Sequence, residues 1–217
     1  MSQPTPLLIE TMHVSPDGHI ALLPYHLQRL KQSATDLAYP YDEPAVGEAI
    51  KQLTATLGST PHRLRLTLSA QGELKLEHAP LQPTPEPVNI LISLDTLAYN
   101  PWLRHKTTNR QWYDAASALL TQHPQLFDVV FFNAKGELCE GSRSNVYIQR
   151  DGQWYTPPLE CGLLGGVKRA QLLDAQQVRV ATISRADFEA ASAIRVSNAL
   201  RGWLDAQLIT LDTLKQG

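Results

Sequence analysis

The sequence predicts an α+β fold made of two halves. Short segments rich in β-branched and aromatic residues, a pattern typical of strands, alternate with segments whose apolar residues recur at helical spacing. A connection with three prolines at residues 81–87 and an irregular stretch at 95–104 interrupt both patterns near the middle of the chain. With 217 residues, the chain can bury one core or two small ones. We therefore expect a small N-terminal α+β domain over residues 1–97 and a larger C-terminal α/β domain over residues 98–217.

The N-terminal half begins with a strand pattern at residues 7–14, and Pro16-Asp17-Gly18 predicts a turn into a second strand at 19–23. Pro24 suits the first turn of a helix, and apolar residues recur at helical spacing as far as Leu37. The next elements are expected to be a helix at 43–57, a hairpin formed by 62–69 and 73–78, and a buried strand at 88–94.

The C-terminal half begins with a helical pattern from residue 107, followed by strands at 128–133 and from Leu138. A hairpin of 146–149 and 153–156 is expected around an Asp151-Gly152 turn. Ser184 is a predicted N-cap, with Asp187 at the third helical position. The remaining elements are a helix from 167, strands at 177–181 and 193–197, and a turn at 198–203 that leads into 204–211.

Composition and charge exclude several functions. The net charge of −2 gives no electrostatic reason to expect binding to nucleic acid or to an anionic membrane. No signal peptide or apolar run of membrane-spanning length is present. The two cysteines, Cys139 and Cys161, have neither metal-site spacing nor the pattern of a disulfide framework, so we expect buried thiols, no metal and a cytoplasmic location.

The stretch from residue 128 to 169 contains the most distinctive polar pattern. Small and polar residues follow Glu140 at the end of a predicted strand, and Gly162, Gly165 and Gly166 lead into a predicted helix. A glycine-rich turn that precedes a helix can offer backbone N–H groups to an anion. Glycines are also common in loops that have no binding role. An acid paired with such a turn suits a cofactor that has a phosphate and a basic ring nitrogen, and pyridoxal phosphate, which also needs a lysine, is one.

Each candidate residue has an ordinary structural alternative. Lys106 could form a Schiff base if its amine is partly desolvated, or it could be a solvated lysine before a helix. Arg29 could bind phosphate or simply be solvated, and Glu140 could support a pyridine nitrogen or be a surface acid. His105 is a possible acid or base. Two further arginines, each of which could bind a substrate carboxylate or be structural, are Arg143 and Arg201.

Taken together, these motifs resemble the class IV (fold-type IV) pyridoxal-phosphate enzymes, which include branched-chain and D-amino-acid aminotransferases and 4-amino-4-deoxychorismate lyase. The resemblance covers residues 7–208. The run from His105 to Arg110 with Tyr113-Asp114, and the run 198–203 (NALRGW), are most similar to the lyase half of fused aminodeoxychorismate synthase–lyase proteins. The other motifs that carry the resemblance are 26–30 (HLQRL), Ser33-Ala34, 140–145 (EGSRSN), 156–158 (TPP) and 162–169 (GLLGGVKR).

The resemblance implies a two-domain fold with the cofactor between the domains, and it implies a role for each matched residue. Lys106 matches the Schiff-base lysine, Glu140 the partner of the pyridine nitrogen, and Arg29 the phosphate-binding arginine. Thr107 is a candidate proton donor. Further cofactor contacts are expected at Asn145, at the Val167-Lys168 turn and at the Ala199-Leu200 turn, and substrate contacts at Arg143, Arg201 and His105.

The function that the resemblance implies is release of pyruvate and 4-aminobenzoate from 4-amino-4-deoxychorismate. A class IV amino-acid transaminase and a cofactor-free binding or structural relative are the alternatives. A homodimer is expected, with an aminodeoxychorismate synthase as a possible partner. The sequence departs from the family pattern at three places: an early Asp-Arg-Gly…Gly-Asp-Gly run is missing, Ile9 replaces an aromatic residue, and Lys168 replaces a phosphate-binding threonine.

Overall fold

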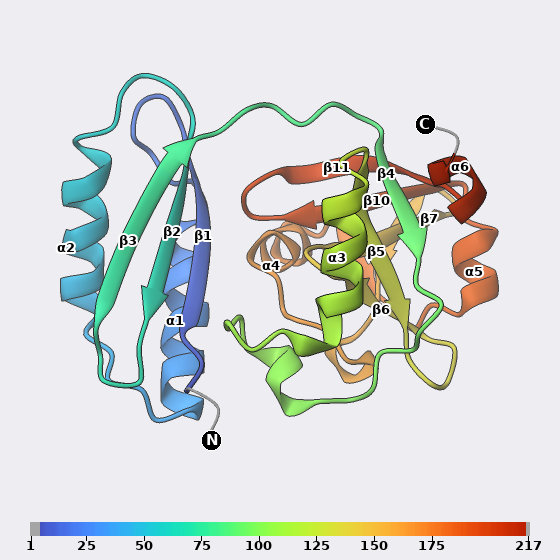
Figure 1. Ribbon diagram of the computed structural model, residues 1–217, viewed down its shortest axis with the longest axis horizontal. Coiled ribbons are helices and arrows are strands. Elements are labelled where there is room, and N and C mark those ends of the chain that lie inside the picture. Colours follow the sequence, from blue (N-terminus) through green and yellow to red (C-terminus); the bar gives the residue numbers. More distant parts are fainter. Residues whose placement is uncertain (1–4, 216–217) are drawn as a thin grey trace. The chain divides into compact units, whose positions relative to one another are not determined.

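The computed structural model describes residues 5–215, which form two compact units. Unit 1 consists of the residues up to Pro83 together with His105–Asn109. Unit 2 consists of Thr84–Arg104 and the chain from Arg110 onward. Each unit contains its own β-sheet with helices packed on it (Figure 1).

The observed division differs from the predicted domains in two respects. The chain leaves unit 1 at Pro83, not at residue 97, and β4 (Val88–Ile92) pairs in parallel with two strands of the unit 2 sheet. The segment His105–Asn109, which carries Lys106, belongs to unit 1 and not to the C-terminal domain, because it lies beside β1 (Leu8–Val14). A segment belongs with its hydrogen-bond partners, and sequence order does not reveal these partners.

Unit 1 is a three-stranded antiparallel sheet in the order β1-β2-β3, with two helices packed on it (Figure 1). The strand predicted at 19–23 is wrong: Leu23 donates its N–H to the Ile20 carbonyl, so this stretch turns directly into the first helix. The prediction that Pro24 lies in the first turn of a helix is confirmed. The remaining elements are α1 (Leu23–Asp36), α2 (Glu43–Thr54), β2 (His62–Leu68) and β3 (Leu74–Pro80).

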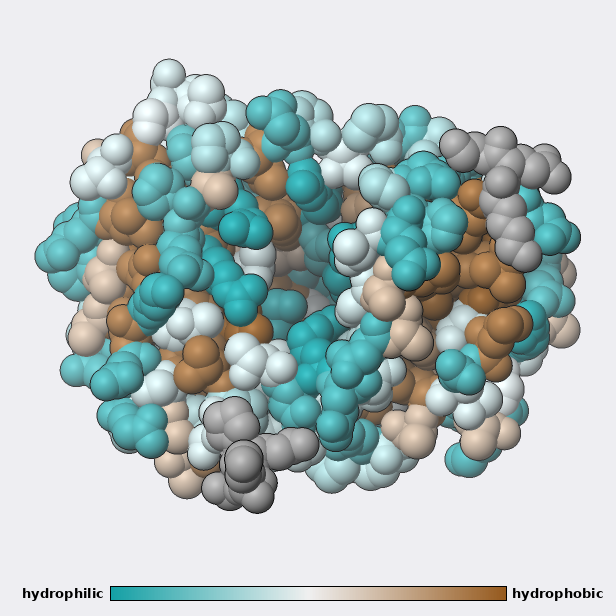
Figure 2. Space-filling view, viewed as in Figure 1, coloured by the Kyte–Doolittle hydropathy of each residue, from teal (hydrophilic) through white to brown (hydrophobic). Residues whose placement is uncertain are grey.

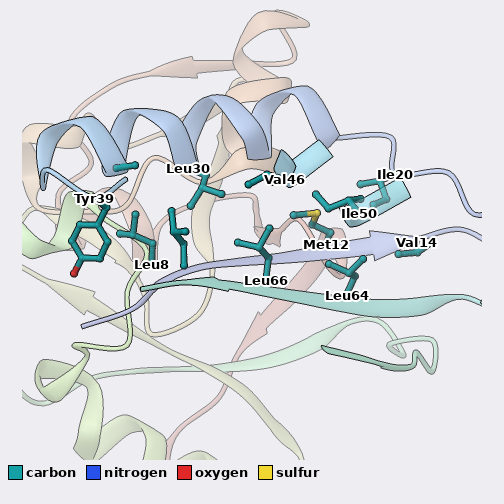
Figure 3. Packing of buried hydrophobic residues seen from close by; sticks show 12 residues of the cluster. Leu8, Met12, Val14, Ile20, Leu30, Tyr39, Val46, Ile50, Leu64 and Leu66 are labelled. Atoms are coloured by element: carbon teal, nitrogen blue, oxygen red, sulfur yellow. The ribbon is translucent and has the colours of Figure 1, made fainter. Parts of the chain in front are cut away.

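The core of unit 1 lies between the helices and one face of the sheet (Figure 3). Alternate residues of a strand point to the same face. Leu8 and Met12 of β1 lie opposite Leu68 and Leu64 of β2, and all four are buried. Glu10 occupies the same face, between Leu8 and Met12, and is therefore a charged residue directed into an apolar core.

Unit 2 contains an eight-stranded mixed sheet in the order β6-β5-β4-β11-β10-β7-β8-β9. The pairs β4–β5, β4–β11 and β8–β9 are parallel, and the others are antiparallel. Its strands are β4 and then β5 (Leu126–Phe132), β6 (Leu138–Gly141), β7 (Asn145–Arg150), β8 (Gln153–Thr156), β9 (Val178–Val180), β10 (Ala193–Asn198) and β11 (Gly202–Leu208). Its helices are α3 (Asp114–Gln122), α4 (Val167–Asp174), α5 (Arg185–Glu189) and α6 (Leu211–Lys215), with 3-10 turns at Pro101–Arg104, Gln111–Tyr113 and Leu159–Cys161.

Local predictions in unit 2 are confirmed where short-range chemistry determines the structure. Asp151 and Gly152 both have positive φ, 51° and 73°, as a tight hairpin turn requires. Ser184 caps α5 in a reciprocal capping box with Asp187. The helical pattern predicted from residue 107 starts later, since a 3-10 turn precedes α3, which begins at Asp114.

Hydrophilic side chains are interspersed with hydrophobic ones over the face of the molecule that Figure 2 shows. The large hydrophobic residues that are exposed in the described chain all belong to unit 2: Leu94, Tyr99, Val180, Leu208 and Leu211. Over residues 5–215, no helix combines the length and apolar character that crossing a bilayer requires.

Candidate active site

The predicted site residues fall into two groups, one in each unit. In unit 1, the segment that carries Lys106 is tied to the start of β1. Ile9 donates its N–H to the Lys106 carbonyl at 2.8 Å, and Thr108 donates its N–H to the Leu7 carbonyl at 2.9 Å. The His105 ring bonds to the hydroxyl of buried Ser33 on α1 (3.1 Å). The half-buried Lys106 is therefore held by main-chain pairing and by its neighbour's side chain.

Thr107 and His105, for which catalytic or substrate-binding roles were predicted, both make hydrogen bonds that hold the segment in place. Thr107 is buried and forms a bridge with Leu8, and its hydroxyl both donates to the Asn109 carbonyl and accepts from the Asn109 N–H. His105 anchors the segment through its bond to Ser33. Both side chains therefore shape the turn around Lys106.

Arg29 is clamped by an acid that the sequence analysis did not single out. Its Nε and Nη2 donate to Oε1 and Oε2 of Glu10 at 2.8 and 2.5 Å, a bidentate arrangement. His26, one turn before Arg29 on α1, contacts Glu10 Oε2 through Nδ1 at 2.6 Å. The signal that could have found Glu10 is its place in the strand, because it interrupts the inward-facing apolar series of β1.

The charge states within this group follow from burial and pairing. Burial by itself raises the pKa of Glu10, but the charge and hydrogen bonds of Arg29, together with His26, outweigh it and hold the pKa at about 2. Burial lowers the pKa of His26 more than Glu10 raises it. A neutral His26 donates through Nδ1 to the carboxylate, and its buried Nε2 has no hydrogen-bond partner among the described residues.

In unit 2, Glu140 at the end of β6 is a buried acid, not a surface one. It is 6 % exposed, and each of its oxygens accepts one hydrogen bond. The Tyr113 hydroxyl donates to Oε1 at 2.6 Å, and the Leu164 N–H donates to Oε2 at 3.1 Å. Burial raises the pKa of Glu140 to about 7, although both hydrogen bonds oppose the shift. In contrast to Glu10, neither hydrogen bond comes from a cation.

The glycine-rich turn before α4 is fixed to the strand ends beside Glu140. Leu164 donates its N–H to Glu140, and its carbonyl accepts from Nδ2 of Asn145 at 2.8 Å. A side chain at Gly166 would overlap the Asn145 Oδ1 atom, so only glycine fits there. The turn that leads into α4, which begins at Val167, is thus bonded both to Glu140 of β6 and to Asn145 of β7.

Two basic side chains on α4 have different surroundings. The amine of Lys168 donates to Gln171 at 2.8 Å, and burial lowers its pKa. Arg169 is buried and donates to the Pro157 carbonyl at 2.8 Å, while its Nε has no hydrogen-bond partner in the described structure. An unsatisfied buried cationic N–H near the start of a helix fits an anion. Arg169 lies at the end of the 162–169 motif, and no role was predicted for it.

The second predicted turn, after β10, is organised by Asn198. Its Oδ1 accepts the N–H groups of Leu200 (3.1 Å) and Arg201 (2.8 Å), and its Nδ2 donates to the Arg143 carbonyl (3.3 Å). The Leu200 N–H is therefore already bonded within the turn. Ala199 precedes it, and both are half-buried. Asn198 was not predicted to have a role.

Arg143 lies in the turn between β6 and β7. Hydrogen bonds to Asp128 fix the conformation of this turn. Asp128 is buried and accepts hydrogen bonds from the hydroxyls of Ser142 and Ser144 at 2.6 and 2.5 Å. It also accepts from the Arg143 N–H at 3.2 Å, while the exposed Arg143 guanidinium stacks 5.1 Å from the Phe127 ring centroid. This packing explains the serines of the motif.

The predicted site residues are therefore divided between the two units. The group in unit 1 contains Arg29, His105, Lys106 and Thr107, and the group in unit 2 contains Glu140, Asn145, Val167 and Lys168, with Arg143 and the 199–201 turn linked through Asn198. Among the described residues, no cluster of three or more His, Cys, Asp or Glu side chains could hold a metal ion.

Comparison with known proteins identifies the family. Residues 7–209 match the family described as amino-transferase class IV. The chain belongs to this family. Its members are pyridoxal-phosphate-dependent enzymes, and the two-unit architecture is that of fold-type IV, as the sequence predicted.

Similar proteins bear the names of both expected activities. A Schizosaccharomyces pombe protein named "Putative aminodeoxychorismate lyase" is 35% identical over 168 residues, which cover 73% of this chain and 70% of that protein. The structure of a "Putative amino-acid aminotransferase" from Mesorhizobium loti is 35% identical, with a TM-score of 0.86 over 94% of this chain and 100% of that one. The structure of 4-amino-4-deoxychorismate lyase from Pseudomonas aeruginosa is similar in fold, with 23% identity and a TM-score of 0.79 over 97% and 88% of the two chains.

Proposed function

We propose that this protein is a pyridoxal 5′-phosphate-dependent lyase that converts 4-amino-4-deoxychorismate into pyruvate and 4-aminobenzoate, a folate precursor. The observation that carries this proposal is Glu140, a buried acid whose two oxygens accept hydrogen bonds from a phenol and from a backbone N–H, both of them neutral donors. Such a carboxylate is suited to a ligand that brings its own positive charge, and a protonated pyridine nitrogen is such a group.

The residues of the structure fit the remaining parts of this cofactor. A phosphate suits the N–H groups at the start of α4, which has no acidic residue in its first turn. We assign Arg29 as a second phosphate ligand, with Glu10 holding its guanidinium. Of the predicted turn at 199–200, we assign only Ala199 to the phosphate, because the Leu200 N–H is bonded to Asn198.

Lys106 is the residue that we assign to bind the cofactor covalently. The cofactor held there would supply an electron sink for the carbon that bears the substrate's amino group. The Nζ of Lys106 would be the base that takes the proton from this carbon. Glu140 supports the ring nitrogen in its protonated form.

Lys106 is also the better donor of the returning proton. Thr107, the other candidate, has its hydroxyl bonded to the Asn109 main chain within a buried turn. The proton goes to the departing enolpyruvyl group, which leaves as pyruvate, while the ring that remains becomes aromatic. The two products together contain all the atoms of the substrate, so no other reactant is needed.

Two observations favour this substrate class over others. The curated relative from Schizosaccharomyces pombe bears the name of such a lyase, and the NALRGW run at residues 198–203 has its asparagine at the centre of a turn that joins the Arg143 segment. Arg143 and Arg201 are the side chains that we assign to the substrate's carboxylates. A class IV transaminase is the second candidate, which the 35% identity to the Mesorhizobium loti structure favours.

The deciding experiment compares pyruvate release with keto-acid exchange in protein reconstituted with pyridoxal phosphate. We expect pyruvate and 4-aminobenzoate in equal amounts from 4-amino-4-deoxychorismate, with little exchange between amino acids and keto acids. Efficient exchange without pyruvate release would make the protein a transaminase. Failure to bind the cofactor would contradict both functions.

Lys106→Ala tests the covalent site separately. We expect this variant to fold, to lose the absorbance of the linked cofactor and to lose turnover. Lys135→Ala, which removes an exposed lysine, serves as the control. Borohydride reduction followed by peptide mass mapping should place the cofactor on Lys106 in the unmodified protein. Cofactor found on another lysine would contradict the assignment.

We further propose a cytoplasmic homodimer that can work with an aminodeoxychorismate synthase. The unpaired buried thiols of Cys139 and Cys161 suit a reducing compartment. Burial raises the pKa of both thiols, to about 12 and about 11, so they are protonated at neutral pH. Sedimentation of the purified protein, alone and mixed with the synthase, tests both parts of this proposal.

A further inference from the structure

Tyr113 has a contact that neither the family motif nor the proposed mechanism explains. It ends the 3-10 turn Gln111–Tyr113 and is buried, with its hydroxyl 2.6 Å from Oε1 of Glu140. The Tyr113 ring packs against Phe131, with 5.4 Å between ring centroids, and under the guanidinium of Arg110 at 4.9 Å. Arg110 in turn donates a hydrogen bond to the Ser142 carbonyl. The Tyr113 ring is thus held by Phe131 and Arg110, and its hydroxyl is bonded to the carboxylate.

We propose that Tyr113 is a positioning residue that fixes the orientation of the Glu140 carboxylate and favours its ionised form. Leu164 supplies one donor to Oε2, and Tyr113 supplies the other to Oε1, so together they define the plane of the carboxylate. The part of this inference that concerns the cofactor rests on the proposed function. The effect of Tyr113 on Glu140 is a property of the protein alone.

The surroundings of Glu140 explain why this hydrogen bond matters. Burial raises the pKa of Glu140, and the Tyr113 hydroxyl is the largest of the influences that lower it. The Leu164 N–H and the charge of Arg110 also lower it, while the charge of Asp128 raises it. Two further titratable groups near Glu140, both affected by its charge, are Cys139 and Arg169.

Tyr113 is the donor to the ionised Glu140 carboxylate, which has no proton of its own to donate. Burial, and then the neighbouring charge of Glu140, raise the pKa of Tyr113 far above its usual value. The phenol therefore stays protonated wherever the enzyme works, and its proton remains available to the carboxylate. Without that donor, Glu140 would remain largely protonated at neutral pH and could not support a protonated ring nitrogen.

A purely structural role is the competing explanation, since the Tyr113 ring also packs against Phe131. Tyr113→Phe separates the two roles because it keeps the ring and removes only the hydroxyl. Tyr147→Phe is the matched control: Tyr147 is also buried in unit 2, and its hydroxyl bonds to Ser197 at 2.7 Å, not to Glu140. Both substitutions remove one buried hydroxyl of the same kind.

The first measurement is the titration of Glu140 in cofactor-free protein by carboxyl ¹³C NMR, with Glu140→Gln used to assign the signal. A hydrogen bond to a charged group is strong enough that its loss should raise the midpoint by about 1 pH unit or more. We expect this shift in Tyr113→Phe and none in Tyr147→Phe. An unchanged midpoint in Tyr113→Phe, or an equal shift in both variants, would overturn the inference.

A second measurement does not depend on the variants folding. Protein without substitutions is produced with 3-fluorotyrosine in place of tyrosine. Its phenols are more acidic and are therefore stronger donors, so the midpoint of the Glu140 titration should fall. A midpoint that stays constant or rises would contradict the inference.

The third measurement uses the loaded enzyme and separates this inference from the proposed function. In Tyr113→Phe, the rise of kcat with pH should shift to higher pH by the same amount as the Glu140 midpoint, with KM little changed. A shift of the NMR midpoint in protein that neither binds pyridoxal phosphate nor releases pyruvate would support the inference and refute the function. Normal turnover with an unshifted kcat profile and an unshifted midpoint would refute the inference and leave the function intact.

Discussion

Glu10 and Glu140 are both buried carboxylates near candidate catalytic residues, yet the two units give them opposite electrostatic environments. In unit 1, Glu10 has a permanent cation, because Arg29 occupies both of its oxygens. In unit 2, the hydrogen bonds that Glu140 accepts come from neutral donors, the Tyr113 hydroxyl and the Leu164 N–H. The pKa of Glu10 is about 2, whereas that of Glu140 is about 7.

This difference shows how the partner determines what a buried acid can do. Glu10 is neutralised by its own chain, so it serves to hold Arg29 in place. Glu140 is costly to ionise until a positive group approaches it, so the folded protein favours a cationic ligand at that position. Burial alone would have made the two residues look alike.

The largest expected effect is the loss of catalysis in Glu140→Gln. The amide is nearly the same size and can still accept hydrogen bonds, but it cannot stabilise a protonated ring nitrogen. We expect kcat to fall by about a thousandfold, which corresponds to about 4 kcal/mol of barrier, while the cofactor still loads onto Lys106. Single-turnover kinetics measure the chemical step. Equal rates in both proteins would show that Glu140 has only a structural role.

Glu10→Gln should instead damage the fold. It leaves the Arg29 guanidinium, which is 14% exposed, without its counter-charge, and breaking a largely buried ion pair in this way costs about 2–4 kcal/mol. The matched control is Glu43→Gln, because the Lys31–Glu43 pair is 63% and 44% exposed and should contribute less than about 1 kcal/mol. Urea unfolding measures both changes. Similar values for the two variants would show that the Glu10 pair is no stronger than a surface pair.

The pH dependence of stability should have opposite signs for the two acids. Folding raises the pKa of Glu140 from 4.5 to about 7, so the folded state holds the extra proton and stability falls as pH rises through this window, by up to about 3 kcal/mol. Folding lowers the pKa of Glu10 from 4.5 to about 2, so its contribution is complete above pH 4.5 and is lost as pH falls toward 2.

Urea unfolding of cofactor-free protein at several pH values measures these slopes. Between pH 4.5 and 7, the unmodified protein should lose stability relative to Glu140→Gln, because the amide does not titrate. The difference between Glu10→Gln and the unmodified protein should shrink as the solution is made more acidic than pH 4.5. Differences that do not vary with pH would contradict the charge states assigned here.

The smallest expected effect concerns cofactor affinity in Arg29→Ala. Loss of a charge-assisted contact to phosphate should weaken binding of pyridoxal phosphate by about ten- to a hundredfold, and excess cofactor should restore turnover. The substitution also leaves the buried Glu10 carboxylate without the positive charge of Arg29. The double variant Glu10→Gln/Arg29→Ala should therefore recover stability without recovering affinity, as measured by unfolding and by equilibrium dialysis. Recovered affinity would mean that Arg29 does not contact the phosphate.

The sequence by itself determined the local elements and the family. The strand at residues 7–14, the tight turn at Asp151-Gly152 and the N-cap at Ser184 depend on residues close in sequence, and all three are confirmed. Lys106 and Glu140 are candidate site residues because they stand in contiguous runs that resemble a known family. The prediction of a strand at 19–23 was wrong because the polarity pattern there also suits a turn that leads into a helix.

Only the tertiary structure decided which side chains meet. Glu10 bonds to His26 and Arg29 across 16 and 19 residues, and Glu140 bonds to Tyr113 across 27. The segment around Lys106 joins unit 1 because it pairs with β1, although the chain has by then already entered unit 2. These contacts depend on strand register and on how helices pack on a sheet, and the spacing of residues along the chain specifies neither. The charge state of each buried acid follows from these contacts, because a pKa in the core depends on the groups that fold against it.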